Sequence, residues 1–118
     1  MATSLTGLKL LIVEDNYLIA SLIEQILADA GCIVSQPIPQ LVQAQDEARG
    51  GDYNAAVLDI NLNGERVYPV ADILSHRNIP YLFLTGYGAQ HVRYSERPRL
   101  RKPFKRAQLL DAVSNIVS

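Results

Sequence analysis

The fold of this chain is constrained most by short apolar runs that are followed directly by carboxylates. Residues 55–58 are all apolar and lead directly into Asp59. An apolar run without alternation is typical of a strand buried on both faces, which occurs in parallel sheets covered by helices. Residues 10–13 repeat the pattern and lead into Glu14 and Asp15. The two runs predict buried strands whose carboxyl ends carry acids, at the edge where α/β sheets collect ligands.

The length and composition indicate one globular domain. The 118 residues are enough for a single core and too few for two. We expect a tail at residues 1–7 and one domain at residues 8–118. The 48% hydrophobic content excludes a disordered chain, and the net charge of -1 argues against a nucleic-acid-binding protein. Most of the basic residues near the C-terminus are interpreted as a solvated face.

Cysteine usage and hydropathy favour a cytoplasmic protein. The single cysteine, Cys32, lies in an apolar stretch and cannot form an internal disulfide, which fits a reducing compartment and a small core residue. The N-terminus lacks a basic segment followed by an apolar run, and no apolar run is long enough to span a membrane. We therefore expect a cytoplasmic chain with no membrane contact.

Predicted strands and helices alternate along the chain. Apolar runs predict strands at residues 8–13, 32–35, 55–59 and 81–84, and residues 99–101 are expected to form a fifth strand. Apolar residues at helical spacing predict a helix capped by Asp15 or Asn16, two further helices at residues 40–49 and 67–74, and a last helix at residues 105–117. Residues 61–64 are expected to form a turn. Residues 86–98 hold few apolar side chains, so any helix there is expected to be short and poorly anchored.

This alternation predicts the arrangement of the sheet. Strands joined by helices pair in parallel through right-handed crossovers, which places helices on both faces. Five such units point to an α/β, flavodoxin-like, doubly wound sheet of five parallel strands in the order 2-1-3-4-5. In that order Glu14, Asp15 and Asp59 converge at one point, and Thr85 and Lys102 end the strands beyond Asp59.

The converging acids predict a metal site. Three carboxylates in one crevice repel each other, and a bound cation relieves the repulsion. Because the donors are oxygens with no nearby His or Cys, Mg²⁺ or Mn²⁺ fits better than zinc. We assign metal binding to Asp15, Asp59 and the backbone carbonyl of Asn61, with Glu14 bound directly or through water.

The remaining side chains suit phosphoryl transfer onto Asp59. Mg²⁺ favours phosphate oxygens, so the metal also predicts a phosphoryl ligand. A carboxylate oxygen of Asp59 is the expected nucleophile, and the Lys102 ammonium offsets charge on an equatorial oxygen. The Thr85 hydroxyl donates to another oxygen once the phosphoryl group is present, which is expected to draw residues 86–98 inward.

At these positions the chain resembles the receiver domain of two-component response regulators. The matching residues end four of the predicted strands: Glu14-Asp15, Asp59, Thr85 and Lys102-Pro103-Phe104. Residues 83–87, Phe-Leu-Thr-Gly-Tyr, look further like the alphaproteobacterial FATGUY group of single-domain receivers. The resemblance implies a CheY-like fold, Asp59 as the phosphoacceptor, a sensor histidine kinase or phosphotransfer protein as the donor, and a cis peptide bond between Lys102 and Pro103.

One position departs from the family pattern. Many receivers carry Tyr or Phe three residues before the lysine, and this chain has Arg99 there. If an aromatic side chain reports the phosphorylation state, Tyr87 or Tyr94 must substitute. Arg93, with other basic residues, is expected to help select a partner that docks on the fourth strand, residues 86–98 and the last helix.

The pattern as a whole favours a stand-alone signalling receiver that is not an enzyme. It is expected to act through a downstream protein partner or as a phosphate sink, without direct nucleic-acid contact. Because the chain stops after its last helix, we expect no output domain. Two alternatives stay open. One is a protein-binding module that ignores phosphorylation, and the other is a metal-dependent phosphatase with an aspartyl-phosphate intermediate, although the second acid of such enzymes is missing two residues after Asp59.

Overall fold

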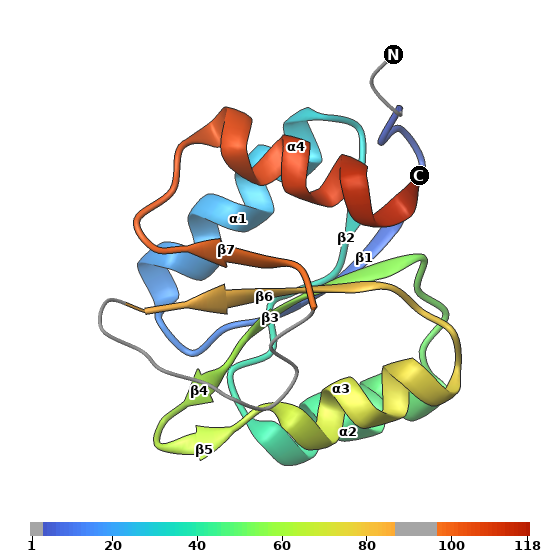
Figure 1. Cartoon of the computed structure of the whole chain (residues 1–118), viewed down its shortest axis with the longest axis vertical. Coiled ribbons are helices and arrows are strands. Elements are labelled where there is room, and N and C mark those ends of the chain that lie inside the picture. Colours follow the sequence, from blue (N-terminus) through green and yellow to red (C-terminus); the bar gives the residue numbers. More distant parts are fainter. Residues whose placement is uncertain (1–3, 87–96) are drawn as a thin grey trace.

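The computed structural model describes residues 4–86 and 97–118 as an α/β fold around one parallel sheet (Figure 1). The sheet has the order β2-β1-β3-β6-β7, which confirms the predicted order 2-1-3-4-5. Its strands are β1 (Lys9–Val13), β2 (Ile33–Val34), β3 (Ala55–Asp59), β6 (Tyr81–Thr85) and β7 (Arg99–Arg101). The helices are α1 (Tyr17–Asp29), α2 (Leu41–Gly50), α3 (Tyr68–His76) and α4 (Arg106–Val117).

Helices cover both faces of the sheet. Figure 1 shows α1 and α4 on one face and α2 and α3 on the other. The central strands β1 and β3 are therefore buried along almost their whole length. This double coverage explains why their sequences are continuous apolar runs rather than alternating patterns.

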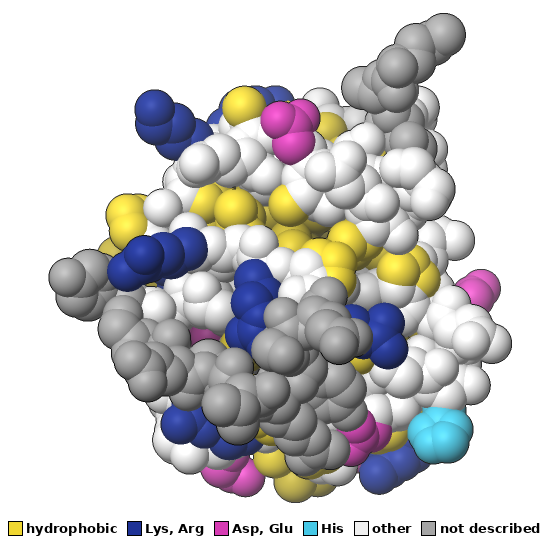
Figure 2. Space-filling view, viewed as in Figure 1, with side chains coloured by type: hydrophobic (Ala, Val, Ile, Leu, Met, Phe, Trp, Pro, Cys, Tyr) yellow, Lys and Arg dark blue, Asp and Glu magenta, His cyan; other side chains and the backbone are white. Residues whose placement is uncertain are grey.

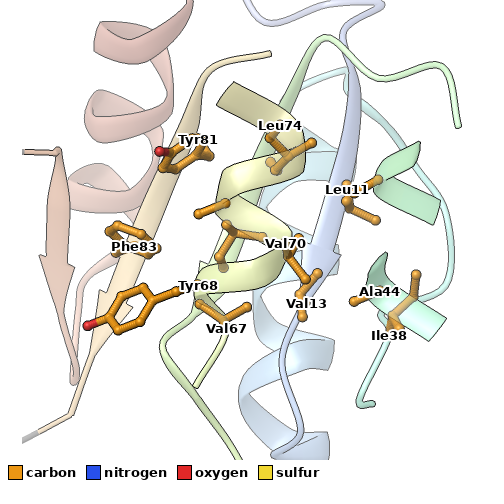
Figure 3. Packing of buried hydrophobic residues seen from close by; sticks show 14 of the residues in the cluster. Leu11, Val13, Ile38, Ala44, Val67, Tyr68, Val70, Leu74, Tyr81 and Phe83 are labelled. Carbon is orange, nitrogen blue, oxygen red and sulfur yellow. The ribbon is translucent and has the colours of Figure 1, made fainter. Parts of the chain in front are cut away.

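Alternate residues of the central strands supply two separate apolar clusters. In β1, Leu11 and Val13 belong to the cluster under α2 and α3, while Leu10 and Ile12 belong to the cluster under α1 and α4. This division follows from the two-residue repeat of a strand. Figure 3 shows the first cluster, where the apolar side of α3 packs against β1 and β6.

The ends of α1 follow the capping signals in the sequence. Of the two candidate caps, Asn16 is used, because its side chain accepts the backbone N–H groups of Leu18 at 3.0 Å and Ile19 at 3.2 Å. Gly31 follows the helix with a φ of 94°, a left-handed conformation that glycine adopts without steric cost. Because Asn16 is the cap, the helix begins directly after the two acids that follow β1.

The structure differs from the predicted elements in two places. The strand expected at residues 32–35 is only Ile33–Val34, because the Cys32 N–H donates to the Leu27 carbonyl at the end of α1 instead of to the sheet. The segment expected to be a simple turn is an antiparallel hairpin of β4 (Asn61–Leu62) and β5 (Glu65–Arg66). The hairpin projects from the carboxyl end of β3 (Figure 1).

The structure also shows the environment of Cys32, the Lys102–Pro103 peptide bond and the packing of the segment before β1. Cys32 is a free, buried cysteine, and the peptide bond between Lys102 and Pro103 is cis. Leu5 is buried, and the Gly7 N–H donates to the Gly31 carbonyl at 2.8 Å, so residues just before β1 pack against the end of α1. Within the two described ranges, no helix combines the length and apolar character needed to cross a bilayer.

Tyr87, Arg93 and Tyr94 lie outside the described residues, as does most of the short helix expected within residues 86–98.

Candidate functional site

The carboxyl ends of β1 and β3 bring three acids together. These strands pair in parallel, with Val13 opposite Leu58, so the residues that follow each strand emerge side by side. Glu14 and Asp59 are buried, and Asp15 is half-buried. Each of the three offers one carboxylate oxygen, and these oxygens all lie within 4.8 Å of one another. The acids that the sequence placed at two strand ends therefore form one cluster.

Lys102 completes the cluster from the other side of β3. Its ammonium Nζ lies 2.7 Å from Glu14 Oε1 and 3.3 Å from Asp59 Oδ2. Its backbone N–H donates to the Thr85 carbonyl at 2.8 Å, which continues the pairing of β7 with β6. The sheet register thus holds the lysine beside the acids, and the buried Glu14 carboxylate binds it more closely than Asp59 does.

Crowding and burial shift the acid–base properties of the cluster. Burial, together with the hydrogen bond and charge of Glu14, raises the pKa of Asp59 to about 8, and Lys102 opposes this shift without cancelling it. Burial also acts to raise the pKa of Asp15, but the bond from the Asn63 N–H and contacts with Glu14 and Asp59 outweigh it, so that pKa is lowered. For Lys102, burial acts to lower the pKa, yet its acidic neighbours outweigh burial and raise it.

The cluster forms the floor of a cleft of about 430 Å³. The described residues that line the cleft come from the ends of β1, β3 and β6, the start of α1, the hairpin and the segment after β7: Glu14, Asp15, Asn16, Ile19, Asp59, Ile60, Asn61, Arg66, Gly86 and Lys102.

The hairpin supplies one wall of the cleft. The Asn61 N–H lies 3.4 Å from Asp59 Oδ1, and the Asn63 N–H donates to Asp15 Oδ2 at 3.0 Å. Asn63 and Gly64 have φ values of 51° and 88°, as the two central residues of a tight hairpin turn require. Arg66 lines the cleft but was not among the residues singled out from the sequence. The Asn63-Gly64 pair was the available signal, because it predicts a hairpin that returns the chain toward Asp59.

Thr85 and Arg99 are not among the described residues that line the cleft. Thr85 is half-buried at the end of β6, two residues along the strand from Phe83. Arg99 pairs with Phe83 across the β6–β7 register, and its guanidinium carbon lies 5.7 Å from the centroid of the Phe83 ring. The guanidinium therefore covers an aromatic ring of the neighbouring strand.

The donor set fits a hard divalent cation. Three carboxylates share the site with one ammonium, so a metal ion would relieve their repulsion, which acts together with burial to raise the pKa of Asp59. Mg²⁺ prefers oxygen ligands and keeps several waters, for which an open cleft leaves room. Asp15, Asp59, Glu14 and the Asn61 carbonyl are the groups that would hold it.

Among the described residues, the basic side chains late in the chain do not gather into a single patch. Figure 2 shows the Lys and Arg side chains of the described residues at several separate places on the visible face. Arg97 and Arg101 are exposed, and Arg97 lies over the Tyr81 ring at 5.4 Å. This distribution is that of a solvated face.

Comparisons with known proteins agree with this geometry. The sequence matches the family model of the response regulator receiver domain over residues 10–114. The fold is similar to the solution structure of SdrG from Sphingomonas melonis Fr1, with 34% sequence identity, a TM-score of 0.85 and coverage of 98% of this chain and 99% of that chain. No curated protein matches the sequence significantly.

Two crystal structures extend the likeness. A response regulator receiver protein from Sinorhizobium medicae WSM419 shares 26% identity with a TM-score of 0.84 and coverage of 97% of both chains. The receiver domain of the sensor histidine kinase PA1611 from Pseudomonas aeruginosa PAO1, which holds a magnesium ion in its active site cleft, shares 28% identity with a TM-score of 0.80, covering 95% of this chain and 98% of that one. Because the family model and these likenesses extend over nearly its whole length, the protein belongs to the response regulator receiver domain family.

Proposed function

We propose that the protein accepts a phosphoryl group on Asp59 from a sensor histidine kinase or a phosphotransfer protein, in a reaction that requires Mg²⁺ or Mn²⁺. The observation that carries the proposal is the meeting of three carboxylates within 4.8 Å, with the Lys102 ammonium 3.3 Å from Asp59 Oδ2. The magnesium-bound receiver domain among the similar structures supports the choice of metal.

In the proposed step, a carboxylate oxygen of Asp59 forms a bond to phosphorus while the bond from phosphorus to the donor atom breaks. The leaving donor atom keeps the electron pair of the broken bond. A bound Mg²⁺ would supply positive charge to the transferring oxygens. Lys102 would contact an oxygen of the transferred group, and the Thr85 hydroxyl at the end of β6 would donate to another.

The raised pKa of Asp59 gives the cation a second role in this proposal. With a pKa of about 8, Asp59 is largely protonated at neutral pH in the metal-free protein. A protonated carboxyl is a poor nucleophile, and positive charge beside it favours the ionised form. Metal binding would therefore prepare the acceptor as well as the phosphoryl group.

The output is proposed to be a change in surface that a protein partner reads, with storage of phosphate as the competing role. Thr85 connects the site to residues 86–98, which we propose as the responding segment together with Tyr87, Arg93 and Tyr94. Arg99 stands at the position where many receivers carry an aromatic switch residue. The single free cysteine, Cys32, is in keeping with a cytoplasmic setting for this signalling.

Intact-mass spectrometry after treatment with acetyl phosphate tests the proposal. We expect one phosphoryl adduct on the wild-type protein with Mg²⁺, far less with EDTA, and none on Asp59→Asn. Asp52→Asn removes the same charge from an exposed position and should behave like wild type. An adduct that persists on Asp59→Asn would refute the assignment, and steady release of phosphate from simple phosphomonoesters would favour the phosphatase alternative.

A further inference from the structure

We propose that Arg66 is a second cationic contact for the phosphoryl group, held on the hairpin wall of the acidic cleft. The inference rests on the proposed function, because it assigns one more residue to the same reaction. Arg66 lines the cleft together with Asp59, and its guanidinium has no hydrogen bond or ion pair with another of the described residues. It is therefore available to an anion that enters the cleft.

The strand register of the hairpin turns Arg66 toward the cleft. Asn61 pairs with Arg66 and Leu62 pairs with Glu65, and residues paired across an antiparallel ladder share a face. Leu62 is 1% exposed and packs in the core cluster, so Leu62 and its partner Glu65 face away from the acids. The other pair, Asn61 with Arg66, lines the cleft. Glu65 instead lines a separate hollow beside the start of α2.

The backbone that carries Arg66 is fixed on both sides. The next residue, Val67, is fully buried, and its N–H donates to the Ile60 carbonyl at 2.8 Å. At the tip, the Asn63 N–H donates to Asp15 Oδ2 at 3.0 Å, and the Gly64 N–H donates to Asn61 Oδ1 at 3.0 Å. Only the side chain of Arg66 has to move to meet a ligand, which lowers the entropy lost on binding.

The charge of the cleft explains why a second cation helps. Among the described lining residues, three are acidic and two, Lys102 and Arg66, are basic, so the formal charge is -1 when all are ionised. A divalent cation makes the cleft net positive, which attracts an anionic donor. Phosphorylation of Asp59 then replaces a monoanion by a dianion and leaves the cleft neutral. Without Arg66, the metal-loaded cleft would be neutral before transfer and negative after it.

Lys102 cannot supply this charge alone, because its ammonium is already bound to Glu14 at 2.7 Å. Arginine also presents a planar fork of donors that matches the oxygens of a phosphoryl group. The same charge repels a divalent cation. Removal of Arg66 should therefore weaken donor capture and strengthen metal binding, and a loss of structure in the hairpin would weaken both.

The test compares Arg66→Gln with Arg66→Lys. Two controls change charge elsewhere: Glu65→Gln on the opposite face of the hairpin, and Arg49→Gln, whose guanidinium forms an exposed ion pair with Asp46 on α2. Intact-mass spectrometry gives the initial rate of phosphorylation as a function of acetyl phosphate concentration in saturating Mg²⁺. Isothermal titration calorimetry gives the Mg²⁺ affinity of each variant.

We expect Arg66→Gln to lower the phosphorylation rate at low donor concentration about three- to tenfold, the range of an exposed charge-assisted contact. The same variant should bind Mg²⁺ more tightly and show a weaker dependence of rate on salt. Arg66→Lys should recover most of the rate, and the two controls should match wild type.

Two results would overturn the inference while the proposed function stands. One is an unchanged rate in Arg66→Gln, and the other is a loss of both rate and Mg²⁺ affinity, which would mean that Arg66 only supports the hairpin. Failure of the wild-type protein to take up a phosphoryl group would be a different result, because it would refute the proposed function itself and this inference with it.

Discussion

Replacement of Asp59 by Asn should stabilise the metal-free protein at pH 9. With the three acid oxygens within 4.8 Å, each neighbouring carboxylate repels ionised Asp59 by at least about 3 kcal/mol at an effective dielectric of about 20. Lys102 at 3.3 Å attracts it by about 5 kcal/mol on the same basis. The two repulsions outweigh the single attraction, and burial adds to them. We expect a gain of about 2 kcal/mol, or roughly 5–10 °C in Tm.

The effect should depend on pH in a defined direction. Because the pKa of Asp59 is raised to about 8 in the folded state, the folded protein keeps a proton that the unfolded chain loses near pH 4. The stability of the wild-type protein should therefore fall as pH rises from about 4 to about 8. Asn resembles the protonated acid, so the difference between the variant and wild type should be small at pH 5 and large at pH 9.

Thermal unfolding in EDTA at pH 5, 7 and 9 measures the difference, and a second series in Mg²⁺ provides the reverse comparison. Mg²⁺ should raise the Tm of the wild-type protein more than that of Asp59→Asn, since the variant lacks one carboxylate ligand. Asp52→Asn, an exposed acid, controls for the change in net charge. The reasoning would be refuted if Asp59→Asn were no more stable than wild type at pH 9 in EDTA, or if its gain were equal at pH 5.

Three further substitutions test other parts of the structure. Lys102→Met should lower the free energy of unfolding by about 2–4 kcal/mol in urea without metal, because the fully buried Glu14 carboxylate loses its cation; no loss would show that the pair contributes little. Asn16→Ala should cost about 1 kcal/mol and speed amide exchange in the first turn of α1. Leu62→Ala should cost about 2–4 kcal/mol by urea unfolding and slow phosphorylation, since it removes the core anchor of the hairpin; a normal rate would separate hairpin packing from function.

Much of the fold could be predicted from the order of strands and helices along the sequence and from the acids that follow the strands. Apolar runs predicted four of the five strands, and residues 99–101 were expected to form the fifth. The alternation with helices predicted the strand order, because parallel strands joined by helices have few possible arrangements. The same logic predicted that acids after β1 and β3 would meet, as Glu14, Asp15 and Asp59 do. These are properties of chain direction and topology, which sequence patterns carry well.

Details set by side-chain packing were less accessible. The close pairing of Lys102 with Glu14, rather than mainly with Asp59, depends on side-chain positions that no local pattern encodes. The hairpin was predicted only as a turn. Leu62 is the single large apolar residue in its two strands, so no alternation of apolar and polar residues indicated β4 or β5. For the same reason Arg66 was not placed at the cleft, although the Asn63-Gly64 turn reverses the chain there.

The two outer strands of the sheet have a consequence for how the protein behaves in concentrated solution. Strand edges with open backbone groups can recruit other chains and seed aggregates. Here β2 is only two residues long, while β7 carries Arg99 and Arg101 and is followed two residues later by Pro103, which has no N–H to donate. Both borders are therefore poor templates for intermolecular strand addition, and the protein should resist fibril growth although its central strands are almost entirely apolar.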